Sequence, residues 1–94
     1  MRVRYTPRAF ADREAIFQYI EARSPRGALS VKRAIERAIR RLEEFPHSAP
    51  LTDETGVYEL TVPRRPYKVY YRVRDETVEI LHIRHTSRRP AELE

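Results

Sequence analysis

Residues 57–84, VYELTVPRRPYKVYYRVRDETVEILHIR, decide the fold of this chain. Apolar and polar side chains alternate through three runs of this stretch, and alternation with a period of two is typical of half-buried strands. The runs are separated by residues 63–66 and by residues 75–76, which are short enough to be hairpin turns. The stretch therefore predicts three consecutive antiparallel strands.

The short turns also predict which residues face each other across the strands. Across the first turn, Leu60 is expected to face Val69. Across the second turn, Tyr71 is expected to face Ile80, and Val69 is expected to face His82. This register collects apolar side chains on one face of the sheet and leaves His82 among them as a structural histidine. That face is predicted to pack against the remainder of the chain.

The opposite face of the predicted sheet mixes charged and apolar side chains, and too few residues remain to cover it. In this register Arg72 lies directly across from Glu79, which is a favourable cross-strand pair. An uncovered face of this composition indicates an interaction surface, although an ordinary solvated face also tolerates a few apolar residues. The side chains predicted on it are Glu59, Thr61, Lys68, Tyr70, Arg72, Glu79, Leu81, Ile83 and His85.

Ahead of the three strands, the chain predicts a short strand at residues 1–5 and then two helices. Thr6-Pro7 and Ser24-Pro25 each supply a helix cap followed by a proline at the first helical position. Apolar residues then recur at helical spacing, and Pro46 is expected to end the second helix. The short join predicts an antiparallel helical hairpin. The apolar positions are Phe10, Ile16, Phe17 and Ile20 in the first helix and Ala28, Val31, Ile35, Ala38, Leu42 and Phe45 in the second.

The net charge of +5 comes from the N-terminal half of the chain. Residues 1–46 carry 11 basic and 6 acidic side chains, whereas residues 47–94 carry 8 of each. Almost all the basic residues are Arg, which suits bidentate contacts to phosphate or carboxylate, although a GC-rich genome also favours Arg codons. The charge indicates an acidic partner, either nucleic acid or an acidic protein segment, without choosing between them.

Composition excludes several classes of protein. The 94 residues are expected to form one domain, 1–94, with a flexible tail from about residue 87. There is no cysteine for a disulfide or a thiolate site, and 2 glycines are too few for a glycine-rich phosphate loop. No apolar run approaches the ~20 residues of a membrane span, and no apolar segment follows Met1 as in a secretory signal. We therefore expect a cytoplasmic protein with no cofactor, metal or membrane partner.

Five short strings carry a resemblance to a known family. They are EARSP at 21–25, LEEFP at 42–46, GVYEL at 56–60, PYKVYYRV at 66–73, and VEIL at 78–81 followed by His85. In this order and spacing they resemble the RelE/ParE superfamily of toxins from type II toxin–antitoxin pairs, over residues 3 to about 90. The resemblance implies an α+β fold of order β-α-α-β-β-β.

The resemblance implies a bacterial toxin that a cognate antitoxin neutralises. ParE-like members inhibit DNA gyrase, and RelE-like members cut mRNA on the ribosome. Tyr58 stands where RelE-like nucleases frequently carry Arg, and no Tyr follows His85. We therefore expect a growth-arresting gyrase inhibitor of the ParE branch, of the kind linked to plasmid stabilisation. A ribosome-dependent mRNA endonuclease and a non-toxic basic binding module remain the alternatives.

Candidate site residues follow from the predicted open face and from the resemblance. An RNA-cleaving site needs a base, an acid and cations, and Lys68, Arg72 and His85 are the candidates for it. Balancing Glu59 and Glu79 is an equally simple role for Lys68 and Arg72. The antitoxin-binding candidates are Glu59, Lys68, Tyr70, Arg72, Leu81 and Ile83. The target-binding candidates are Tyr70, Arg84, His85, Arg88 and Arg89.

Overall fold

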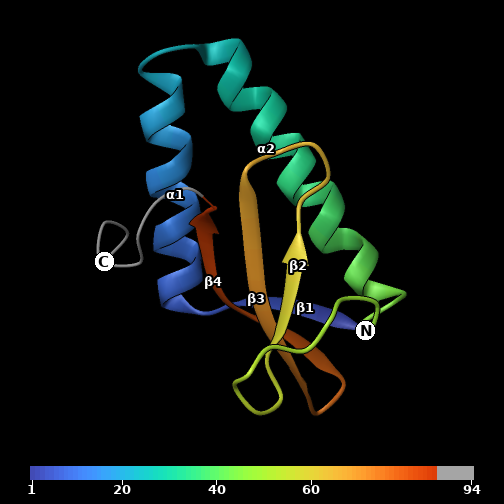
Figure 1. Ribbon diagram of the computed structural model, residues 1–94. Coiled ribbons are helices and arrows are strands. Elements are labelled where there is room, and N and C mark those ends of the chain that lie inside the picture. Colours follow the sequence, from blue (N-terminus) through green and yellow to red (C-terminus); the bar gives the residue numbers. More distant parts are fainter. Residues whose placement is uncertain (87–94) are drawn as a thin grey trace.

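Two helices cover one face of a four-stranded sheet in the computed structural model, which describes residues 1–86 (Figure 1). The strand order is β1-β4-β3-β2, with β1 parallel to β4 and the other neighbours antiparallel. The predicted α+β fold is confirmed, and the N-terminal strand joins the sheet as a fourth member. The elements are β1 (Arg2–Tyr5), α1 (Pro7–Glu21), α2 (Pro25–Arg40), the 3-10 helix η1 (Arg41–Glu43), β2 (Tyr58–Thr61), β3 (Tyr67–Arg74) and β4 (Thr77–His85).

Both helices begin where the Thr-Pro and Ser-Pro pairs predict. The side chain of Thr6 accepts a hydrogen bond from the backbone N–H of Ala9 at 3.2 Å, and Ser24 accepts one from Gly27 at 3.0 Å. Each cap satisfies an N–H group that the first helical turn leaves without a partner. In the described part of the chain, neither helix has the length and apolar character needed to cross a membrane.

Two aromatic residues predicted on the apolar helix stripes lie at the surface instead. Phe10 is 53% exposed, because the preceding residue, Ala9, occupies the buried face of α1 together with Ile16. Phe45 is 51% exposed, because α2 ends at Arg40 and continues as a 3-10 turn, which ends the helix before Pro46. A 3-10 turn has a different angular period from an α-helix, so it changes the face that later residues occupy.

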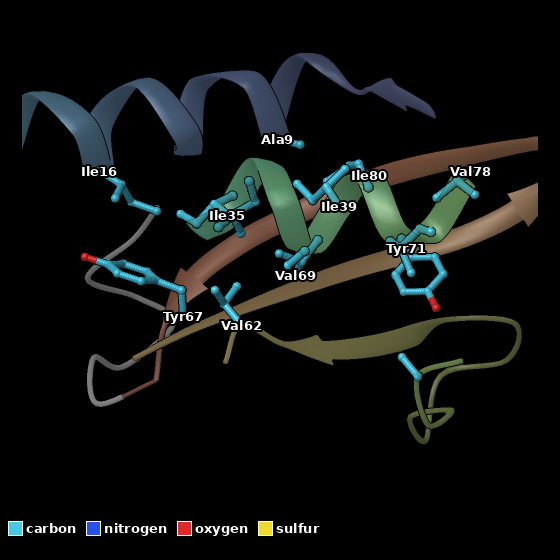
Figure 2. Close-up of a cluster of buried hydrophobic side chains, with 14 residues drawn as sticks. Ala9, Ile16, Ile35, Ile39, Val62, Tyr67, Val69, Tyr71, Val78 and Ile80 are labelled. Atoms are coloured by element: carbon cyan, nitrogen blue, oxygen red, sulfur yellow. The ribbon is translucent and has the colours of Figure 1, made fainter. Parts of the chain in front are cut away.

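The core lies between the helices and the inner face of the sheet (Figure 2). Val69, Tyr71 and Ile80 of the sheet are fully buried against residues that include Ile35 of α2. The hydroxyl of the buried Tyr71 donates a hydrogen bond to the carbonyl oxygen of Pro46 at 2.9 Å. The sheet therefore fixes the loop after η1 through a polar contact as well as through apolar packing.

The predicted pairing of the three antiparallel strands is confirmed near both turns. Leu60 lies opposite Val69, and Tyr71 lies opposite Ile80. Residues 75–76 form the second turn with φ angles of 52° and 58°. Positive φ at both central residues is the geometry of a type I′ turn, whose twist suits a two-residue hairpin.

Beyond Ile80, the predicted register is wrong by one residue. Between Tyr70 and Tyr71 the pairing shifts, so that Tyr70 faces His82 and Val69 faces Ile83. Leu81 is the extra residue of a β-bulge, and a bulge moves every later side chain to the other face. His82 therefore does not lie beside Val69, and Ile83 is 1% exposed in the core instead of on the opposite face.

The bulge lies where β4 changes its edge partner. β1 pairs with β4 as far as Ile80, and there the hydroxyl of Thr6 donates to the carbonyl oxygen of Ile80 at 2.9 Å. Two residues past the bulge, the backbone N–H of Ile83 donates to Oδ2 of Asp12 at 3.0 Å. A side chain of α1 thus replaces β1 as the acceptor along this edge and satisfies a strand N–H that would otherwise lack a partner.

Candidate interaction site on the open sheet face

The sheet face turned away from the helices, which we call the open face, carries most of the candidate site residues. Tyr70 and Leu81 on this face are only partly buried by residues 1–86, as the sequence predicts. Lys68 and Arg72 flank Tyr70 on β3 and are likewise partly exposed. The open face is therefore accessible to a partner over the described part of the chain.

Glu79 is the centre of one half of the open face. Its carboxylate accepts hydrogen bonds from Nε of Arg72 at 2.7 Å, from Arg74 at 3.4 Å and from Arg4. The hydrogen bonds from Arg72 and Arg4 lower the pKa of Glu79 to about 2. The three arginines come from β1 and β3, so one carboxylate of β4 connects three strands. The predicted pair of Arg72 with Glu79 is confirmed.

Lys68 is paired in the same way. Its Nζ lies 2.6 Å from Oε1 of Glu59 on the neighbouring strand. The hydrogen bond to Glu59 is the largest cause that raises the pKa of Lys68. Lys68 and Arg72 thus share a face, as predicted, but each is held by a carboxylate of its own chain. This is the charge-balancing role that the sequence analysis left open for them.

The other half of the open face holds a cluster that the sequence analysis missed. The rings of Tyr70 and His82 are stacked with centroids 5.3 Å apart and planes 18° apart. The guanidinium of Arg84 lies 6.0 Å from the centre of the Tyr70 ring. His82 Nδ1 lies 3.0 Å from Oδ2 of Asp12. The only sequence signal was the loss of alternation at residues 80–83, where apolar residues occupy consecutive positions 80 and 81.

A shallow depression of about 520 Å³ lies over this cluster. Aromatic, apolar, cationic and acidic groups all line it, so it offers several types of contact within a small area. A surface of this mixed chemistry suits a protein partner with an apolar anchor and a polar rim. The lining residues are Arg8, Thr52, Asp53, Glu54, Val57, Glu59, Tyr70, Leu81, His82 and Arg84.

His85 does not join the other two nuclease candidates. It lies opposite Tyr67 in the register, and the two rings meet edge to face with centroids 5.3 Å apart. Tyr67 belongs to the buried core, so His85 is on the helix side of the sheet, because the bulge moved it there. The expectation that Lys68, Arg72 and His85 share one face is therefore wrong.

The remaining site predictions divide into three outcomes. His82 and His85 point to opposite faces, as expected, although each occupies the face predicted for the other. Ile83 is buried by its own chain and is withdrawn as an antitoxin contact. Arg88 and Arg89 lie outside the described residues. Among residues 1–86, no three His, Cys, Asp or Glu side chains are placed to hold a metal ion.

Comparison with known proteins places the chain in a family. A family model described as ParE toxin of type II toxin-antitoxin system, parDE, matches residues 3–90. Toxin RelE2 of Caulobacter vibrioides is 37% identical over 87 residues, which are 93% of this chain and 97% of that protein. The fold and the matched residues together define a toxin of a type II toxin–antitoxin system. The chain belongs to the ParE toxin family, within the RelE/ParE superfamily.

Solved structures of related toxins have the same fold. The chromosomal ParDE system of P. aeruginosa matches with a TM-score of 0.82 at 27% identity, over 93% of this chain and 97% of that one. The intact RelBE toxin-antitoxin complex of E. coli matches with a TM-score of 0.68 at 15% identity, over 94% and 98% of the two chains. The second likeness concerns the fold alone.

Proposed function

We propose that a cognate antitoxin neutralises this toxin and that the free toxin inhibits DNA gyrase. The family match and the likeness to the ParDE system of P. aeruginosa support the ParE branch of the superfamily. The related RelBE structure is described as an intact toxin-antitoxin complex, and that description supports an antitoxin partner.

The observation that carries the choice of gyrase over mRNA is the arrangement of the three nuclease candidates. Lys68 and Arg72 are each engaged by a carboxylate, at 2.6 Å and 2.7 Å, and His85 lies on the other side of the sheet. Cleavage of RNA by general acid–base catalysis needs its base, acid and cations around one phosphodiester. These three side chains do not supply such an arrangement, which supports a toxin that binds its target.

The open face offers sites for both partners. Tyr70 and Leu81 supply apolar surface for an antitoxin, and a buried aromatic anchor surrounded by charge is typical of binding hot spots. Tyr70 and Arg84 are also the target-binding candidates on this face that we propose for contact with gyrase, whereas the candidate His85 lies against Tyr67 on the helix side of the sheet. A shared contact surface gives the simplest neutralisation, because an antitoxin bound there excludes the target.

A supercoiling assay tests this function. Toxin purified without antitoxin is added to gyrase and relaxed plasmid DNA, with and without equimolar cognate antitoxin. We expect the toxin to inhibit supercoiling and the antitoxin to restore it. Tyr70→Ala is expected to weaken inhibition, whereas Leu51→Ala, at an exposed loop position, serves as the matched control. Supercoiling at the normal rate with saturating folded toxin contradicts the proposal.

A ribosome-dependent mRNA endonuclease is the second candidate, because the bulge brings His82 and Arg84 beside Tyr70 on the open face. His82 is a possible acid or base, and Asp12 holds its ring. In translation reactions, mRNA cleavage that His82→Ala and Arg84→Ala abolish, together with normal gyrase activity, favours this candidate. Expression of the chain alone without growth arrest favours the non-toxic binding module.

A further inference from the structure

The side of α2 next to the β2–β3 turn carries a row of arginines, which we call the arginine groove. Arg26, Arg33 and Arg37 lie along α2, and Arg65 comes from the turn. These side chains line a shallow groove of about 420 Å³. The guanidinium of Arg65 donates a hydrogen bond to the hydroxyl of Ser30, which fixes the turn against the helix. The groove is therefore built by two elements far apart in the sequence.

The arginine groove differs from the open face because its cations have no carboxylate beside them. Within residues 1–86, the guanidinium groups of Arg26, Arg33 and Arg37 form no ion pair, hydrogen bond or ring contact, and no acidic side chain lines the groove. Glu36 is the only carboxylate of α2, and it pairs with Arg13 at 3.1 Å. A groove with uncompensated positive charge attracts an anionic ligand.

The lining of the groove favours a phosphate backbone over an acidic protein segment. Leu29 and Ala34 are its only apolar lining residues in the described part of the chain, and no aromatic side chain lines it. Protein interfaces place apolar and aromatic anchors at their centre, and single-stranded nucleic acids stack on aromatic rings. Arg and Ser side chains, by contrast, are common contacts to the phosphates of a duplex.

The spacing of the cations also suits a rigid duplex. Arg26 and Arg37 are separated by 11 positions of one continuous helix. A rise of about 1.5 Å per residue places them about 16 Å apart along the helix axis. One strand of a duplex presents a phosphate about every 3.4 Å of its axis. One strand therefore presents about four to five phosphates over this length, enough for three or four arginines to contact one each.

We propose that the arginine groove binds the phosphodiester backbone of duplex DNA without reading its base sequence. The choice of duplex DNA over duplex RNA rests on the proposed function, since gyrase acts on duplex DNA. The groove lies on a different element from Tyr70 and Arg84, so it is a second contact surface, separate from the surface proposed to contact gyrase. A toxin held on DNA in this way is concentrated near the enzyme that it inhibits.

Fluorescence anisotropy with a labelled 20-base-pair duplex tests the proposal on the full-length chain. We expect log K to fall with log salt concentration with a slope of about −3, since about three to four phosphates are neutralised. Arg33→Glu is expected to weaken binding at least tenfold. Lys32→Glu is the matched control, because Lys32 lies on the same helix in a groove that contains Glu14 and Glu21. Thermal melting confirms that each variant is folded.

The possible results distinguish DNA binding by the arginine groove from inhibition of gyrase. If Arg33→Glu binds DNA within twofold of wild type, or if Lys32→Glu loses as much affinity as Arg33→Glu, the arginine groove is not the DNA site. Tighter binding of duplex RNA, or stronger competition by polyglutamate of equal charge, overturns duplex DNA as the ligand. Inhibition of gyrase without binding to free DNA also contradicts this inference, yet it leaves the proposed function intact. DNA binding through the groove with no inhibition contradicts only the proposed function.

Discussion

Oδ2 of Asp12 lies 3.0 Å from Nδ1 of His82 and also 3.0 Å from the backbone nitrogen of Ile83. One carboxylate of α1 therefore holds both the side chain and the main chain of β4 directly after the bulge. The bulge decides that His82 is on the open face and Ile83 in the core. A contact between α1 and β4 thus supports the arrangement of the candidate site.

Replacement of Asp12 tests this support. Asp12→Ala leaves the N–H of Ile83 without an acceptor, and we expect the free energy of unfolding to fall by about 1–3 kcal/mol. Asp12→Asn keeps an oxygen that can accept from Ile83, so a smaller loss is expected. Urea denaturation measures both changes. Asp53→Ala, at an exposed loop position, is the control and is expected to change stability by less than about 0.5 kcal/mol.

Glu79 makes the stability of the protein depend on acid. Its pKa is lowered to about 2 in the folded state by the hydrogen bonds from Arg72 and Arg4. A lowered pKa stabilises the fold above the ordinary pKa of the carboxyl group, and this stabilisation disappears as the pH falls toward 2. Glu79→Gln is therefore expected to destabilise the protein at pH 7, with the difference from wild type shrinking between about pH 4.5 and pH 2.

Thermal melting from pH 7 to pH 2 measures the difference in stability between Glu79→Gln and wild type. Glu76→Gln is the control, because Glu76 is exposed and forms no ion pair within residues 1–86. The melting temperature of Glu76→Gln is expected to stay close to that of wild type at every pH. A melting-temperature difference between Glu79→Gln and wild type that stays constant from pH 7 to pH 2 contradicts the role assigned to Arg72 and Arg4.

The buried hydroxyl of Tyr71 gives a third prediction. Tyr71→Phe removes the hydrogen bond to the carbonyl oxygen of Pro46 but keeps the ring in the core. We expect the free energy of unfolding to fall by about 1 kcal/mol, the usual net contribution of one such hydrogen bond. Tyr58→Phe removes the bond between its hydroxyl and Nδ1 of His47, which is at an exposed position, and should cost less. If urea denaturation gives the same loss of unfolding free energy for Tyr71→Phe and Tyr58→Phe, burial does not strengthen the hydrogen bond of Tyr71.

Local sequence patterns predicted the parts of the fold that depend on neighbouring residues. The Thr6 and Ser24 caps are encoded within four residues of each helix start. The turn at residues 75–76 fixes the register as far as Tyr71 and Ile80. The bulge at Leu81 was not predictable in this way, because it depends on where β1 ends and on Asp12, both distant in the sequence.

The candidate site was likewise predictable only in the part of the sheet that precedes the bulge. Arg72 lies directly opposite Glu79, and Lys68 lies diagonally across from Glu59, in the part of the register that the turns determine, so both pairs follow from the sequence. The stack of Tyr70 on His82 lies beyond the bulge and did not follow. A single extra residue changed which histidine the open face presents.

Truncation of two neighbouring residues of β4 tests the new register. Ile83→Ala removes a side chain from the core, and we expect a loss of about 2–5 kcal/mol. Leu81→Ala acts at a partly exposed bulge position and is expected to cost less than about 1 kcal/mol. The sequence-based register placed both residues on the open face, where the two losses are expected to be similar. Urea denaturation of the two variants therefore distinguishes the registers.

Antitoxin binding gives the last prediction, because Leu81 has a small part in stability but a proposed part in the interface. Leu81→Ala and Tyr70→Ala are each expected to weaken antitoxin binding at least tenfold, or about 1.4 kcal/mol, as truncation of an interface anchor does. Isothermal titration calorimetry with the cognate antitoxin measures the change. Leu51→Ala is the control, since Leu51 is an exposed leucine that does not itself line the depression over the Tyr70 cluster. If all three variants bind the antitoxin within twofold of wild type, the open face is not the antitoxin site, and the exposed surface of the helical hairpin becomes the place to look for it.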